Sequence, residues 1–77
     1  MQIKVLGTGC ANCSATARLI EEVAEALNVP VSVEKVEDIA QIMRYGVMST
    51  PGVVIDDQVV HYGSVPDRAL IMQWLQG

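Results

Sequence analysis

Residues 7–14 read GTGCANCS and hold both cysteines of the chain, Cys10 and Cys13. This segment follows a short apolar run and precedes a stretch with helical periodicity, so a strand is expected to give way to a helix here. Two thiols at this spacing can form a redox pair, part of a metal site or a structural disulfide. The rest of the chain has to decide among these three interpretations.

The composition is that of one small acidic domain, residues 1–77. Half of the residues (51%) are hydrophobic, the formal net charge is −4, and the basic residues are scattered rather than clustered. Nucleic acids and anionic membranes require a concentrated basic surface, so neither is expected as a partner. The apolar runs are far shorter than the roughly 18 residues that suggest a membrane span.

The N-terminus bears on the expected cellular location. Met1 and Gln2 lead directly into a strand pattern, without the basic and apolar regions of a signal peptide. We therefore expect a cytoplasmic protein. Thiols are mostly kept reduced in that compartment, which favours a catalytic or metal-binding cysteine pair over a permanent crosslink.

Hydrophobic periodicity predicts seven elements in the order βαβαββα. Alternating or β-branched runs indicate strands, apolar residues three and four positions apart indicate helices, and Asp56-Asp57 indicates a hairpin turn. The expected elements are a strand in 2–7, a helix from 13 to 27, a strand in 31–36, a short helix after 38, strands at 53–55 and 59–60, and a helix from the cap at 64 to about 75. This order predicts an α/β fold with a four-stranded mixed sheet and three flanking helices.

The helix ends are also predicted from local sequence. Asp38 with Gln41, and Ser64 with Asp67, have the spacing of capping boxes at helix starts. Gly46 is expected to cap the end of the second helix.

The cysteine spacing suits thiol–disulfide exchange. Cys10 is expected in the loop before the first helix and Cys13 in its first turn, where the helix dipole favours a thiolate. One thiol can attack a disulfide and the other can then resolve the mixed disulfide. Ala11 and Asn12 are small or polar, so they leave the Cys10 sulfur approachable.

The two other interpretations have less support. A disulfide that closes so short a loop contributes roughly 2 kcal/mol and joins residues that the helix already holds. A structural zinc site needs four ligands, and His61 is the only histidine. A carrier that binds Cu(I) through two thiolates stays open as an alternative; no cofactor and no resident metal are expected.

The Cys10-Ala11-Asn12-Cys13 motif after a first strand, with Thr50-Pro51 before the third, resembles the thioredoxin/glutaredoxin fold. The resemblance covers the whole chain and is greatest to very small thioredoxin-like proteins of bacteria and archaea. It implies that Pro51 is cis and packs beside the cysteine motif, and that the Thr50 backbone pairs with the substrate. Proteins of this family often have a glycine after the last strand, next to the active site, and Gly63 matches that position.

Two departures separate the chain from thioredoxins proper. Gly9 stands where those proteins have a tryptophan, and Lys4 lies in the first strand in place of a buried acidic residue. Glutaredoxins bind glutathione partly through basic side chains near the site, and no basic residue closely flanks this motif.

Next to the proline, we hypothesise that Tyr45, Val47 and Met48 form an apolar rim where a partner docks.

These observations predict a dithiol–disulfide oxidoreductase in which Cys10 attacks and Cys13 resolves. The expected partners are a protein or small-molecule disulfide as substrate and a reductase as electron donor, and the expected state is a monomer. Two alternatives remain: the Cu(I)-type carrier, and a non-catalytic redox sensor or interaction module on the same fold.

Overall fold

The computed structural model describes residues 1–8 and 11–76 and contains the expected order of elements. The strand bounds differ from the predicted ones by one or two residues, the first helix begins two residues earlier than predicted, and the last helix begins at Arg68, beyond the predicted start at Ser64. The elements are β1 (Gln2–Leu6), α1 (Ala11–Leu27), β2 (Ser32–Val36), α2 (Ile39–Arg44), β3 (Gly52–Ile55), β4 (Gln58–Tyr62) and α3 (Arg68–Gln76).

The four strands form one mixed sheet in the order β2-β1-β3-β4. β1 and β2 are parallel and joined by α1, while β1 with β3 and β3 with β4 are antiparallel. Asp56 and Asp57, with φ of 48° and 69°, form the two-residue turn of the predicted hairpin. The register shifts between Val53 and Val54, where one residue of β4 is left without a partner.

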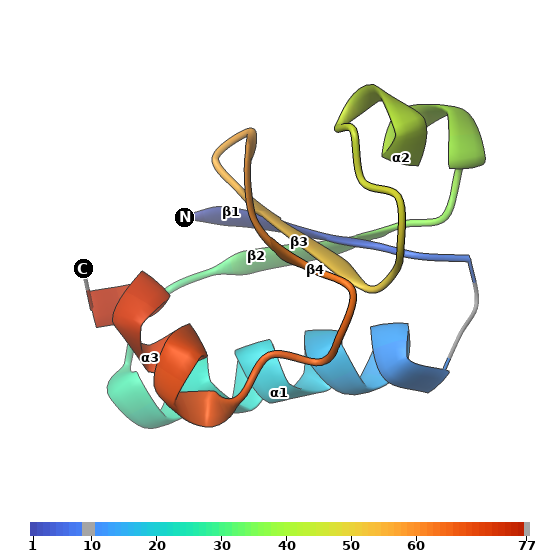
Figure 1. Ribbon diagram of the computed structural model, residues 1–77. Coiled ribbons are helices and arrows are strands. Elements are labelled where there is room, and N and C mark those ends of the chain that lie inside the picture. The colour runs from blue at the N-terminus through green and yellow to red at the C-terminus, as the bar shows by residue number, and fades with distance from the viewer. Residues whose placement is uncertain (9–10, 77) are drawn as a thin grey trace.

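Helices cover both faces of the sheet, which makes three layers (Figure 1). α1 and α3 pack on one face and α2 lies on the other. Strand alternation divides β1 between the two layers: Ile3 and Val5 contact the core under α1 and α3, and Leu6 contacts the smaller core under α2. α2 itself contributes one buried residue, Ile42, so this short helix is held by little apolar surface.

The second helix begins at the predicted cap. The Asp38 carboxylate accepts a hydrogen bond from the Ala40 N–H at 2.9 Å. The prediction for its C-terminus was off by one residue, because Tyr45 is the C-cap and Gly46 follows it. Gly46 has a φ of 74°, the left-handed conformation that glycine adopts without steric cost after a helix.

The predicted capping role of Ser64 is wrong. α3 begins at Arg68, and the Asp67 carboxylate accepts a hydrogen bond from the Leu70 N–H at 2.8 Å. Asp67 is therefore the capping residue, as suits a carboxylate at the positive end of a helix. The Ser64 hydroxyl instead lies 3.2 Å from His61 Nε2. None of the described helices is both long and apolar enough to cross a membrane.

Candidate active site

Cys13 lies in the first turn of α1 and is buried, with 4% of its surface exposed. It is disulfide-bonded in the structure. Its Sγ lies 3.9 Å from the backbone carbonyl oxygen of Leu6, at the end of β1. In the reduced protein a thiol at this position can donate a weak hydrogen bond to that carbonyl oxygen.

Gly7, directly after β1, leaves room for the Cys13 sulfur. A Cβ atom added at Gly7 would overlap Cys13 Sγ, and it would lie 3.0 Å from Cys13 Cβ and 3.7 Å from Thr50 Cβ. The end of β1, the start of α1 and the loop before β3 therefore meet at Gly7. This close approach makes Gly7 a residue of the site, although sequence reasoning used it only as the end of a strand.

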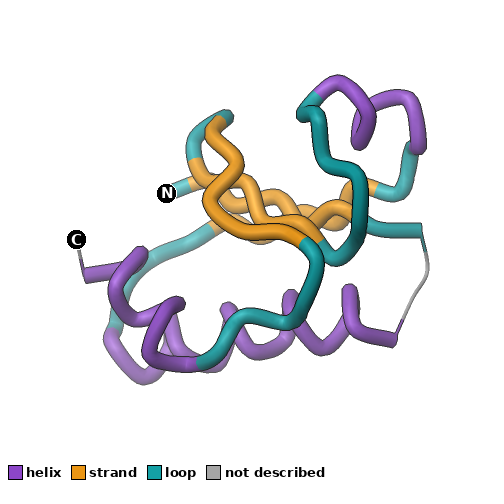
Figure 2. Tube along the Cα trace, viewed as in Figure 1, coloured by secondary structure: helices purple, strands orange, loops and turns teal. Residues whose placement is uncertain are grey.

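The loop before β3 is the second component of the site (Figure 2). It passes along the end of the sheet near which α1 starts, and the Thr50–Pro51 peptide bond in it is cis. Thr50 is exposed, while Pro51 is fully buried. The Pro51 carbonyl accepts a hydrogen bond from the Gly63 N–H at 2.9 Å, which ties this loop to the end of β4.

Gly63 is held in a conformation that favours glycine. Its φ is 95°, and an added Cβ would lie 3.2 Å from the Ser49 hydroxyl oxygen. The structure thus connects Gly63 to Pro51 and Ser49, and connects Thr50 through Gly7 to Cys13.

The remaining predicted residues belong to the motif itself. Ala11 and Asn12 are exposed in the first turn of α1, as expected for residues that leave a sulfur approachable. The Asn12 carbonyl accepts a hydrogen bond at 2.8 Å from the hydroxyl of Thr16, a fully buried polar side chain. Cys10 and Gly9 lie outside the described residues.

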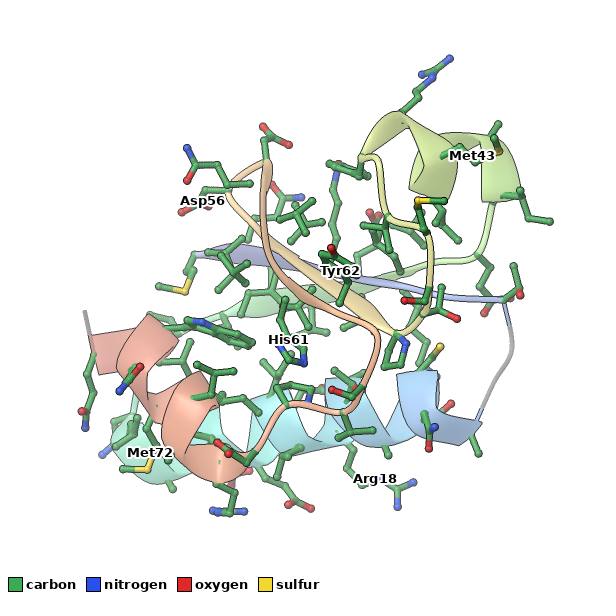
Figure 3. The ribbon with its side chains drawn as sticks, in the orientation of Figure 1. Arg18, Met43, Asp56, His61, Tyr62 and Met72 are labelled. Atoms are coloured by element: carbon green, nitrogen blue, oxygen red, sulfur yellow. The ribbon has the colours of Figure 1, made fainter. Side chains whose placement is uncertain are left out.

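The hypothesised apolar rim is only partly present. Met48 is 94% exposed beside the Thr50-Pro51 loop, as a rim residue would be. Val47 is instead buried under α2, because its side chain joins the smaller core. Tyr45 points its hydroxyl to Lys4 Nζ, 3.3 Å away. Tyr62 at the end of β4 is an exposed aromatic side chain that the sequence analysis did not single out (Figure 3).

Comparison with known proteins identifies the family. A family model described as a thioredoxin domain matches residues 1–76. The chain belongs to the thioredoxin family. A thioredoxin of Methanothermobacter thermautotrophicus is 31% identical over 75 residues, 97% of each chain. A thioredoxin of Methanocaldococcus jannaschii is 36% identical over 74 residues, 96% of this chain and 85% of the relative.

The fold has a counterpart among solved structures. Thioredoxin 1 from the thermophilic eubacterium Thermosipho africanus TCF52B superposes with a TM-score of 0.66 at 17% identity, covering 99% of this chain and 91% of that one. The thioredoxin fold predicted from the sequence is confirmed. As a member of this family, the chain is a thiol–disulfide oxidoreductase, as the sequence predicted.

The described residues contain no group of three or more histidine, cysteine or acidic side chains that could hold a metal ion.

Proposed function

We propose that Cys10 is the attacking thiol of this oxidoreductase and that Cys13 is the resolving thiol. Cys10 immediately precedes Ala11, the first residue of α1, and a thiol beside a helix N-terminus is favoured as the reactive thiolate. Cys13 is buried against the end of β1. The single observation that carries the assignment is this contrast between a buried Cys13 and exposed Ala11 and Asn12, which leave the approach to the motif on the Cys10 side.

The exchange moves two electrons and two protons. The Cys10 thiolate attacks one sulfur of a substrate disulfide, whose bond breaks, and the departing thiolate takes a proton from solvent. The Cys13 thiol then loses its proton and attacks the Cys10 sulfur, which releases the second substrate thiol. The substrate is reduced to a dithiol and the pair Cys10 and Cys13 is oxidised to a disulfide.

We place the substrate beside the Thr50-Pro51 loop. Thr50 is exposed and offers backbone groups to an extended chain, and Pro51 fixes the base of the loop through its buried ring and its bond to Gly63. Ala11 and Asn12 border the opposite side. Met48 and Tyr62 are exposed apolar or aromatic side chains, 94% and 57% accessible, that suit docking of a polypeptide more than of a small polar thiol.

The proposed substrates are therefore disulfides of proteins, reduced in the cytoplasm. A reductase that supplies two electrons returns the oxidised pair to the dithiol. We propose that the protein works as a monomer, since exchange requires one copy of the motif and one substrate.

Trapping of the mixed disulfide tests these roles. The Cys13→Ser variant, incubated with a small protein that has one accessible disulfide, should form a covalent adduct at Cys10 that mass spectrometry detects under non-reducing conditions. Cys10→Ser should form none, and Ser14→Ala serves as a control that keeps both thiols and turns over without a stable adduct. An adduct on Cys10→Ser but not on Cys13→Ser would reverse the assigned roles.

A further inference from the structure

A cavity lies on the face of the sheet that carries α2, away from the core under α1 and α3. Its volume is about 240 Å³, and side chains from β1, from α2 and from the C-cap of α2 line it: Lys4, Gln41, Arg44 and Tyr45. Lys4 faces this layer because its neighbours in β1, Ile3 and Val5, face the opposite one. None of these four residues belongs to the cysteine site.

Most N–H donors of the lining side chains make no hydrogen bond to a described residue. Among the described residues the Lys4 ammonium donates a single hydrogen bond, to the Tyr45 hydroxyl oxygen at 3.3 Å. The side chains of Arg44 and Gln41 have no hydrogen bond to any described residue, and the only ion pair in the described part of the chain joins Arg68 to Glu22. An ammonium, a guanidinium and an amide therefore border one cavity with most of their N–H groups available.

The charge at this place is opposite to that of the protein as a whole. Two of the five basic residues line the cavity, although the chain has a net charge of −4. The hydrogen bond to Tyr45 and the Coulombic interaction with Tyr45 are the main causes that raise the pKa of Lys4, and the carboxylates of Asp57 and Glu34 raise it further, so this residue stays charged throughout the neutral range. Glu34 is the register partner of Lys4 on β2, so one carboxylate stands beside the ammonium at the base of this face. A cleft lined by one sign of charge concentrates ions of the other sign.

We propose that this cavity binds a phosphate group, either free phosphate or the phosphate of a small phosphomonoester. A guanidinium pairs with two phosphate oxygens at once, and an ammonium binds a third as a point charge. A phosphate dianion has more oxygens and a higher charge than a carboxylate, so it can meet the three donor groups from different directions, whereas a carboxylate has two coplanar oxygens and one charge. The volume exceeds that of one phosphate, so the organic part of an ester fits beside the Tyr45 ring.

Binding requires only local movement. Arg44 is the last residue of α2 and is exposed, so its long side chain can turn toward the ligand without breaking a contact. A ligand held by both Lys4 and Arg44 would link α2 to the sheet, where Ile42 is the one buried residue of the helix. The site does not involve either cysteine, so its test is independent of the exchange mechanism.

A nuclear magnetic resonance titration of the full ¹⁵N-labelled chain tests the proposal. Inorganic phosphate is added against sodium chloride of equal ionic strength, and the amides of β1 and α2 are followed. We expect saturable shifts at Lys4, Gln41 and Tyr45 with a dissociation constant on the order of 1 mM, a typical strength for a few charged contacts. Arg44→Gln should weaken binding about tenfold, as expected when a hydrogen bond between charged groups is lost.

The matched control is Arg18→Gln, which removes the same charge from α1, on the far side of the sheet (Figure 3). It should leave the dissociation constant unchanged. Tighter binding of glycerol phosphate than of phosphate would assign the site to an ester, and equal binding would assign it to free phosphate. Three results would each overturn the proposal: shifts no larger than with chloride, saturation by acetate at the same concentration, or equal weakening by Arg18→Gln.

Discussion

Replacing Gly7 by alanine should destabilise the oxidised protein more than the reduced one. The added Cβ would overlap Cys13 Sγ, and overpacking of this kind costs typically about 1–3 kcal/mol. Gly7 lies outside the positive-φ region, so restricting the unfolded chain returns about 0.4–1 kcal/mol. We therefore expect a net loss of about 1–2 kcal/mol in the free energy of unfolding of the oxidised form. A free Cys13 thiol can rotate away from the new methyl group, whereas a disulfide sulfur cannot, so the reduced form loses less.

The difference between the two forms should move the reduction potential. If the reduced form lost nothing, a loss of about 1–2 kcal/mol in the oxidised form would make the potential roughly 20–40 mV more positive for a two-electron couple, so the expected shift is positive and no larger than about 40 mV. Urea unfolding of both redox forms, together with a potential measured against glutathione, gives both quantities. Gly52→Ala is the control, because its Cβ would meet side-chain atoms of Leu6 and Val47 at 3.3–3.4 Å and no sulfur. If both redox forms of Gly7→Ala lost the same free energy of unfolding and the potential were unchanged, the contact with Cys13 Sγ would not be specific to the disulfide form.

Three further changes have definite expected outcomes. Asp38→Ala removes the cap of α2 and should lower the free energy of unfolding by about 1 kcal/mol in urea titrations; no loss would mean that the cap is not used. Tyr45→Phe removes the main cause of the raised pKa of Lys4, so an NMR titration of its side-chain nitrogen should give a lower pKa than in the wild type. A lysine whose pKa is raised on folding stabilises the protein at pH values below its unfolded-state pKa, and this stabilisation is lost as the pH rises through its folded-state pKa. The difference in free energy of unfolding between Tyr45→Phe and the wild type should therefore shrink in strong alkali. A difference that stays constant with pH would contradict the role given to Tyr45. Arg68→Ala breaks the ion pair that Arg68 forms with Glu22 at 3.8 Å, in which both side chains are more than half exposed. In urea titrations it should change the free energy of unfolding by less than about 1 kcal/mol in low salt and by almost nothing in 1 M salt.

Local patterns accounted for most of the fold. The apolar spacing of Ile20, Val23 and Ala24 places all three in the core under α1, and Asp56-Asp57 forms the turn that its residue types predict. Such features depend on neighbours a few positions away, and the chain itself records them. The family motif added the relation between the cysteines and the Thr50-Pro51 loop, which no periodicity contains.

Features that depend on distant contacts were not predictable. Ser64 and Asp67 are both good capping residues by type, and their sequence spacing alone does not show that Asp67 is the one that accepts the hydrogen bond of the helix N-terminus. Gly7 leaves room for a sulfur atom only because the folded chain places the Cys13 side chain against the end of β1. Likewise, Lys4 and Tyr45 are 41 residues apart and meet only when α2 covers the sheet, so the sequence suggested an apolar rim at Tyr45 where the fold places a polar contact.

A redox titration tests whether Cys10 and Cys13 form one redox-active pair. The protein is equilibrated in graded dithiothreitol or glutathione buffers, the free thiols are alkylated, and their number is counted by mass. We expect one reversible two-electron transition, in which Cys10 and Cys13 are protected together, with a midpoint in the range of roughly −180 to −270 mV. Two free thiols at every potential, with no intramolecular disulfide, would contradict this pairing.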